Sequence, residues 1–134
     1  APAAVAEPAA PVAQATVFVS EGGMLRPLAN GGRVALRDGW AEVRFTPYPV
    51  GPRSDLDVRI VDGRSGRAAD ADVTVLYEMI GMEHGMIAQH ATPRNDGHHT
   101  APISIAMPGH WRFVLRIARA GEVESVVLVL PVTP

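Results

Sequence analysis

The chain has 134 residues, no cysteine and a formal net charge of −2. That length is typical of one domain with one hydrophobic core. The missing cysteine excludes disulfides, iron–sulfur clusters and cysteine nucleophiles, and the interspersed charges provide no basic stripe for nucleic acid. No run approaches the roughly 20 apolar residues of a membrane-spanning helix, so we expect no transmembrane segment.

Residues 1–15, APAAVAEPAAPVAQA, contain no side chain that could anchor a core. Their prolines favour extended backbone, so we expect an extended arm or linker, followed by one domain over residues 16–134. The chain begins with Ala rather than Met, and a run of small residues is typical of what remains after signal-peptide cleavage. We therefore expect an exported protein, periplasmic or extracellular.

Apolar and polar residues alternate in short runs after this arm, and Gly and Pro interrupt every longer stretch. Alternation with a period of two predicts strands, and frequent turn residues leave little room for helices. The sequence therefore predicts an all-β fold, an immunoglobulin-like antiparallel β-sandwich of seven or eight strands. The predicted strands are 16–20, 33–36, 40–46, 56–60, 73–79, 101–107, 111–117 and 124–132.

The last predicted strand, 124–132, is an almost continuous apolar run. Such a run is typical of a strand that is covered on both faces.

Methionine and histidine are concentrated in one quarter of the chain. Four of the five methionines and all five histidines lie between residues 79 and 111. Thioether and imidazole are soft to borderline ligands that suit Cu(I) better than Mg²⁺ or Ca²⁺, while the missing cysteine excludes a blue-copper centre. The clustered residues are Met79, Met82, His84, Met86, His90, His98, His99, Met107 and His110.

Two predicted strands bring methionines to one end of the sandwich. Met79 and Met107 each end an inward-facing row, and Met82, His84 and Met86 lie in the loop that follows Met79. If the two strands are neighbours, the loop lies over both strand ends. We therefore predict a Cu(I) site formed by Met79, Met82, His84, Met86 and Met107.

Plain packing is the alternative for part of this cluster. Methionine is a flexible core residue, so Met79 and Met107 also fit an ordinary hydrophobic interior. The histidines at 90, 98, 99 and 110 flank turns, where exposed or backbone-bonded histidine is common, and their role stays open. Trp111 is expected to anchor the core.

The serines lack a nucleophile-elbow context, and Asp70 and Asp72 lie on a turn, so we predict no enzyme.

Residues 79–86 read MIGMEHGM, and residues 107–111 read MPGHW. At these motifs, within residues 55–117, the chain resembles the YtkA-like family of small extracytoplasmic immunoglobulin-like domains. That family has Met-x-x-Met-x-His-Gly at a strand end and Met-x-Gly-x-Trp before a later strand. The resemblance implies copper handling or assembly of respiratory oxidases. Gly97-His98-His99 departs from the family, which commonly has Gly-x-Tyr there.

Two functions follow as expectations. The first is a non-catalytic extracytoplasmic module that binds Cu(I) through the cluster. The second is an accessory structural subunit without a metal, docked on the extracytoplasmic face of a membrane-embedded respiratory or photosynthetic complex. In that case residues 1–15 are expected to lie extended along a partner protein, because restricted prolines make such a segment a low-entropy ligand.

Overall fold

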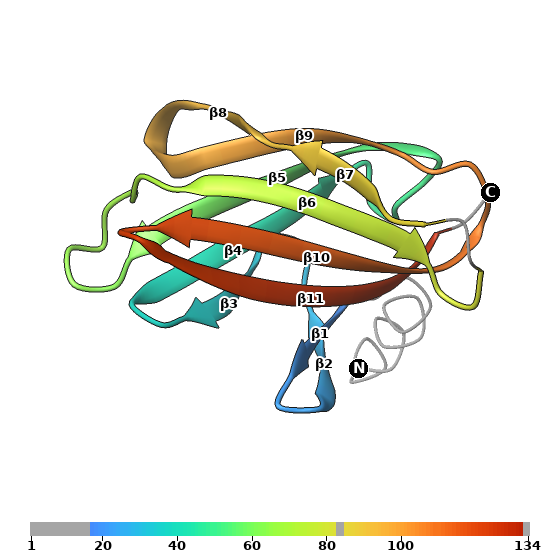
Figure 1. Cartoon of the computed structure of the whole chain (residues 1–134), viewed down its shortest axis with the longest axis horizontal. Helices are drawn as coiled ribbons and strands as arrows, with labels where there is room; N and C mark the ends of the chain where they lie inside the picture. The colour runs from blue at the N-terminus through green and yellow to red at the C-terminus, as the bar shows by residue number, and fades with distance from the viewer. Residues whose placement is uncertain (1–16, 83–84, 133–134) are drawn as a thin grey trace, which may run out of the picture.

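The computed structural model describes residues 17–82 and 85–132, which form a β-sandwich of two antiparallel sheets (Figure 1). One sheet has six strands in the order β2-β1-β11-β10-β6-β7, and the other has five in the order β3-β4-β5-β9-β8. The strands are β1 (Val17–Glu21), β2 (Met24–Leu28), β3 (Gly32–Leu36), β4 (Gly39–Thr46), β5 (Arg53–Asp62), β6 (Asp72–Met79), β7 (Ile87–His90), β8 (Thr92–Pro93), β9 (His98–Ser104), β10 (Gly109–Arg119) and β11 (Glu122–Val132). The predicted all-β sandwich is confirmed.

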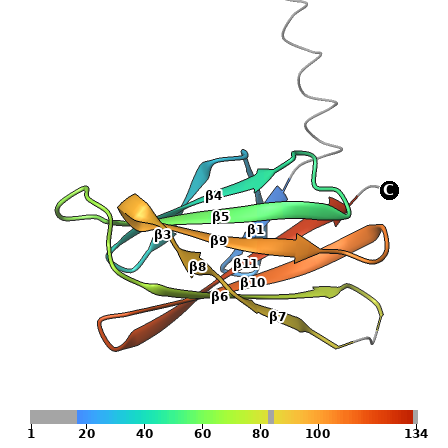
Figure 2. The same ribbon diagram turned by 90° about the horizontal axis from the view of Figure 1, so that it is seen from above.

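Alternation along each long strand explains why the sheets pack face to face. In β10, Trp111, Phe113, Leu115 and Ile117 are buried, while the residues between them face away from the core. Side chains of a strand point to opposite faces in turn, so one face of each sheet becomes the core. Figure 2 shows the two layers edge on, with β4, β5 and β9 in one and β6, β10 and β11 in the other.

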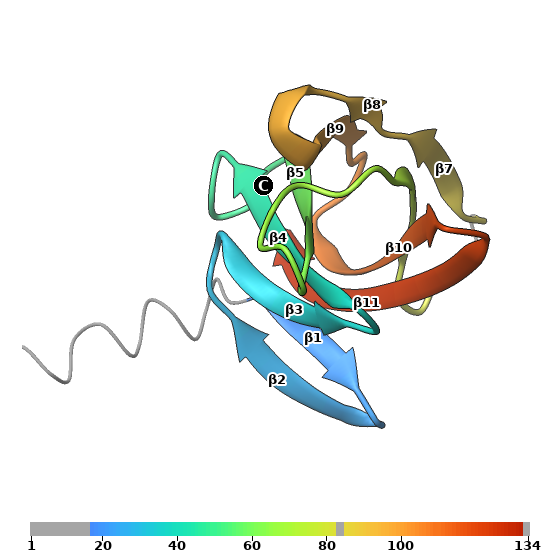
Figure 3. The same ribbon diagram turned by 90° about the vertical axis from the view of Figure 1, so that its left-hand side faces the viewer.

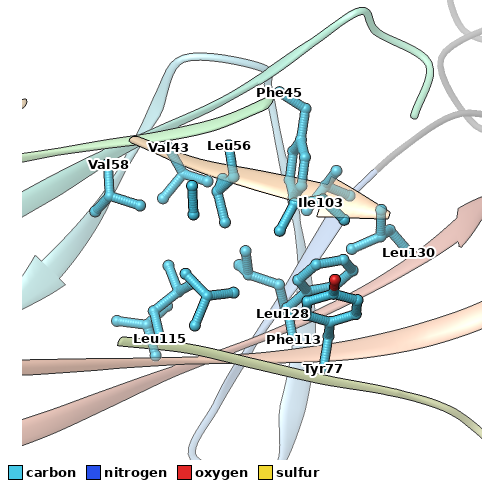
Figure 4. Packing of buried hydrophobic residues seen from close by; sticks show 14 of the residues in the cluster. Val43, Phe45, Leu56, Val58, Tyr77, Ile103, Phe113, Leu115, Leu128 and Leu130 are labelled. Atoms are coloured by element: carbon cyan, nitrogen blue, oxygen red, sulfur yellow. The ribbon is translucent and has the colours of Figure 1, made fainter. Parts of the chain in front are cut away.

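Aromatic rings hold the middle of the core together. The ring of Phe113 stacks on that of Tyr77, with ring centroids 5.0 Å apart. It also makes an edge-to-face contact with the ring of Phe45, which belongs to the other sheet, at a centroid distance of 5.6 Å. Figure 4 shows these rings among Val43, Leu56, Ile103 and other labelled core residues. Aromatic pairs in these geometries add to the stabilisation from buried apolar area.

The structure has 11 strands, more than the seven or eight expected. The additional strands are β2, β7 and β8, all at sheet edges. Pro27 and Arg26 interrupt alternation in β2, and β7 and β8 are too short for a periodic signal. Figure 3 shows β2 with β1 as a hairpin on one side of the sandwich.

Two predictions fall outside the described residues. These are the extended arm at residues 1–15 and the position of His84 in the copper cluster. Within residues 17–82 and 85–132, no helix is long and apolar enough to cross a membrane.

Candidate methionine centre

The end of β6 and the start of β10 lie side by side at one end of the sandwich. Met79, the last residue of β6, is the register partner of Trp111 in β10. The main-chain N–H of Ile80 donates to the carbonyl of His110 at 2.8 Å, which extends this pairing one residue further. The start of the first motif therefore lies beside the second motif. The neighbour of β6 is β10, so the condition that predicted strands 73–79 and 101–107 lie side by side is not met: β6 and β9 belong to different sheets.

Met79 packs over a glycine that provides room for its side chain. Gly109 has a φ of +147°, and a Cβ placed on it would lie 2.5 Å from the Met79 Cε. Such a distance is far below a van der Waals contact, so a side chain at this position would displace the Met79 methyl group, and the positive φ itself favours glycine. The Met-x-Gly-x-Trp motif thus has a packing reason for its glycine.

A hollow of about 310 Å³ opens beside Met79 and is largely apolar. Two predicted ligands, Met79 and Met107, line it together. Among the described lining residues, Ser104 alone has a hydroxyl group. The described lining residues are Met79, Gly85, Ile87, Ser104, Ala106, Met107 and Trp111.

The expectation that Met107 ends an inward-facing row is wrong. Strand β9 ends at Ser104, and residues 105–108 form the connection to β10, so the alternation stops before Met107. Met107 is 41% exposed and lines the hollow rather than packing in the core. Because Met107 is exposed, it contributes less to core packing than the sequence suggested. Met79, in contrast, is half-buried and packs against the core cluster.

The loop methionines occupy two different positions. Met82 lies in the turn after β6, where its N–H donates to the Met79 carbonyl at 3.3 Å. It lines a second hollow of about 350 Å³, on which Met79 also borders, together with Glu78 and Arg112. Met86 is 43% exposed and is flanked by Gly85 and Ile87, two lining residues of the first hollow. The structure therefore places Met79 and Met107 in one hollow, whereas Met82 shares only the second hollow with Met79.

Trp111 fixes the segment that carries Met107. Its indole N–H donates to the Met107 carbonyl at 3.1 Å, and the ring is 6% exposed. The same ring lines the hollow and lies 6.1 Å from the Tyr77 ring, centroid to centroid. The prediction that Trp111 anchors the core is consistent with this burial, and the hydrogen bond gives it a second role.

Three of the four described histidines have side-chain partners of their own, and none of these partners lines this hollow. The His90 Nε2 lies 2.6 Å from Asp72 Oδ1, and the His98 Nδ1 lies 2.7 Å from Asp57 Oδ2. His99 is buried, with its ring nitrogens facing the carbonyl oxygens of Val58 and Ala71. His110 is exposed next to Gly109, and its carbonyl accepts the bond from Ile80. None of these four lines the hollow of Met79 and Met107.

The chemistry of the hollow is that of soft donors in an apolar wall. No group of three or more His, Asp and Glu that could hold a metal occurs among residues 17–82 and 85–132. Hard cations such as Mg²⁺ and Ca²⁺ favour carboxylate ligands, and the described residues of this wall include none, whereas Cu(I) accepts thioethers. The residues present therefore fit a soft monovalent ion better than a hard divalent one.

Several lining residues were not singled out from the sequence as part of the site. Ile87, Ser104 and Ala106 line the hollow, yet none belongs to a residue class that binds copper. Ile87 reaches it because β7 pairs with β6 in the register Tyr77 to Ile87, which places Ile87 on the inner side of the sheet. Only the strand pairing reveals this position, because the sequence of the loop before β7 does not predict how β7 aligns with β6.

Comparison with known proteins supports the architecture. No protein-family model matches the chain, and no curated protein sequence matches it. The fold is similar to the crystal structure of the PmoD soluble domain from Methylocystis sp. ATCC 49242 (Rockwell), with a TM-score of 0.54 and 11% sequence identity. The similarity covers 75% of this chain and 96% of that one. At this identity the likeness establishes a shared β-rich fold, and the resemblance to the YtkA-like family rests on its two motifs.

Proposed function

We propose that this chain is a non-catalytic, extracytoplasmic copper-binding module, in which Met79 and Met107 provide the central thioether ligands for Cu(I). Met82, His84 and Met86 belong to the adjoining loop and complete the donor set expected from the sequence. The observation that carries the proposal is that Met79, at the end of β6, and Met107, in the connection from β9 to β10, line one apolar hollow. Cu(I) bound there would be held by neutral sulfur, which needs no deprotonation.

The surroundings support a binding role rather than a reaction. Trp111 donates a hydrogen bond to the Met107 carbonyl and lines the hollow, and Gly109 leaves room for the Met79 methyl group. Apolar walls exclude water, which favours a soft ion over strongly hydrated cations. The chain would thus bind, hold and release Cu(I) without changing its oxidation state.

Anaerobic competition against a Cu(I) chelator tests the proposal. We expect about one Cu(I) per chain and no displacement by excess Mg²⁺ or Ca²⁺. The double variant Met79→Leu with Met107→Leu keeps the apolar volume but removes both sulfur atoms. Its Cu(I) affinity should fall at least about tenfold, which corresponds to about 1.4 kcal/mol.

The chain contains its own matched control. Met24 lies on β2 and is 73% exposed, so Met24→Leu removes an accessible thioether from a different part of the molecule. Its affinity should equal that of the unaltered chain. Equal affinity in the Met79/Met107 double variant would contradict the proposal.

A second candidate function is docking as an accessory subunit on the extracytoplasmic face of a membrane-embedded respiratory or photosynthetic complex. The observation that favours it is a group of exposed apolar side chains at or beside the two hollows: Ile80, which lines the second hollow, is 47% exposed, and Met86 and Ile87 are each 43% exposed. Apolar side chains gathered in this way commonly mark contact surfaces.

The variant Ile80→Ser distinguishes the two functions, because Ile80 has no thioether and does not line the hollow of Met79 and Met107. Under the docking function this variant should reduce co-sedimentation with membranes of the source organism. Under the copper function it should leave Cu(I) affinity close to that of the unaltered chain. A chain that binds no Cu(I) but loses co-sedimentation in this variant would favour docking alone.

A further inference from the structure

The outer face of the six-stranded sheet carries rows of mostly apolar side chains that no described strand covers. Figure 1 looks onto this face, and no described strand lies in front of β10 or β11 there. Strand register shows that one row of outward side chains crosses all six strands. That row is Leu25, Ser20, Val127, Val114, Leu76 and Ala88, and we call it the outer stripe.

The row beside the outer stripe continues the pattern. Phe18 and Val129 are register partners, and both are only half-buried on this face. The free face of an antiparallel sheet commonly presents polar side chains to water. Here β11 is apolar on both sides, as its sequence predicted for a strand with two covered faces, yet the described chain covers only one.

Charge on this face is unbalanced at one position. Arg112 forms an ion pair with Glu78, whereas Arg116, two residues further along β10, is exposed and has no ion pair among the described residues. Its register partners are Ser125 and Thr74, which are neutral. A segment that covers the outer stripe should therefore be apolar and carry a carboxylate near Arg116.

We propose that residues 1–15 of the same chain cover the outer stripe, with Glu7 meeting Arg116. This segment consists of Ala, Val and Pro apart from Gln14 and Glu7, and Glu7 is its one charged side chain. Small apolar residues suit a flat sheet surface, and proline lowers the entropy lost when such a segment becomes ordered. The inference is independent of copper binding.

The lengths allow this contact. Residue 17 begins β1, which lies two strands from β10 in the sheet order. Phe18 is the register partner of Val129, which is the register partner of Arg112. Arg116 lies four residues further along β10 than Arg112. Its position is therefore two strands across and four residues along from Phe18, a distance of about 17 Å. The ten residue steps from Glu7 to Val17 can span about 33 Å when extended. The segment therefore reaches Arg116 with chain to spare.

Paramagnetic relaxation in the full-length chain tests the proposal. Because the sequence contains no cysteine, Ala10→Cys gives one attachment point for a nitroxide label without altering any described contact. We expect loss of amide signal intensity at Val114 and Val127, and little change at Thr100 in the five-stranded sheet. Equal, weak effects on both sheets would overturn the proposal.

Charge variants and a mixing experiment complete the test. Arg116→Gln and Glu7→Gln should each weaken the effect at Val114, while Arg44→Gln, on the other sheet, should not. Spin-labelled chain mixed with isotope-labelled chain that carries no spin label should produce no broadening if the contact is within one molecule. Broadening in the mixture would overturn the assignment to the same chain and would favour the expectation that this segment lies on another subunit.

Discussion

The indole N–H of Trp111 donates to the carbonyl of Met107 at 3.1 Å, so a core aromatic residue holds the backbone that carries an exposed thioether. Trp111→Phe keeps an aromatic ring but removes this donor and some volume. We expect a loss of about 1–3 kcal/mol in the free energy of unfolding, measured by urea denaturation.

A surface tryptophan provides the comparison for this change. Trp40 is half-buried, and its indole N–H bonds to the carboxylate of Glu42 at 3.2 Å. Trp40→Phe should cost less than Trp111→Phe and should leave Cu(I) affinity unchanged, whereas Trp111→Phe should weaken it. Equal Cu(I) affinity in both variants would show that the Trp111 bond does not position Met107 for the metal.

Gly109 and Met79 should be energetically coupled. Gly109→Ala introduces a methyl group 2.5 Å from the Met79 Cε, at a φ of +147° that side chains rarely adopt. We expect a destabilisation of about 1–3 kcal/mol, part of which is relieved when Met79 is also changed to Ala. Thermal unfolding of the two single variants and the double variant measures this, and strict additivity would contradict the contact.

The two central methionines should differ in their effect on stability. Met79 is half-buried against the core, so Met79→Ala should cost about 1–2 kcal/mol. Met107 is 41% exposed, so Met107→Ala should cost less than about 1 kcal/mol. Chemical denaturation of both apo-proteins checks the order, and a larger cost for Met107 would place that side chain in the core after all.

Asp62 should make stability depend on acidity. Hydrogen bonds from the Ser65 backbone N–H and hydroxyl, the latter at 2.9 Å, lower the pKa of Asp62 below its ordinary value of 3.8. A carboxyl whose folded pKa is lowered stabilises the fold above its unfolded pKa, and this contribution disappears as the pH falls through the folded pKa. Asp62→Asn should flatten the pH dependence below about pH 4.

NMR titration of the Asp62 carboxyl gives the direct measurement. Ser65→Ala removes the hydroxyl donor but retains the backbone donor, so it should raise the pKa of Asp62 only in part. An unchanged pKa in Ser65→Ala would show that the hydroxyl bond contributes nothing to the charged form.

The long strands were predictable because alternation survives in them. Val73, Val75 and Tyr77 are buried in β6 as their spacing indicated, and Trp111 to Ile117 repeat the pattern in β10. Strand β2 was not predictable in this way, because it is a sheet edge that buries only Leu28 and contains a proline. Edge strands need less burial on their faces, so they leave a weaker periodic signal.

The site was predictable in composition and only partly in geometry. Met79 lies where its row ends, but Met107 lies beyond the end of β9, because residues 105–108 turn toward β10. Local alternation cannot reveal where a strand ends when apolar residues continue into the turn. The contribution of Ile87 depends on long-range pairing of β7 with β6, which no local pattern encodes.

The central claim is that Met79 and Met107 bind Cu(I) in the hollow they share. The most direct measurement is NMR of the full chain labelled with ¹³C in its methionine methyl groups and titrated anaerobically with Cu(I), each signal being assigned by a Met→Leu variant. The account predicts saturating shifts of the Met79 and Met107 methyl signals at about one equivalent, with Met24 unchanged as the internal reference. Shifts confined to Met24, or no shift of Met79 and Met107 beyond that equivalent, would contradict it.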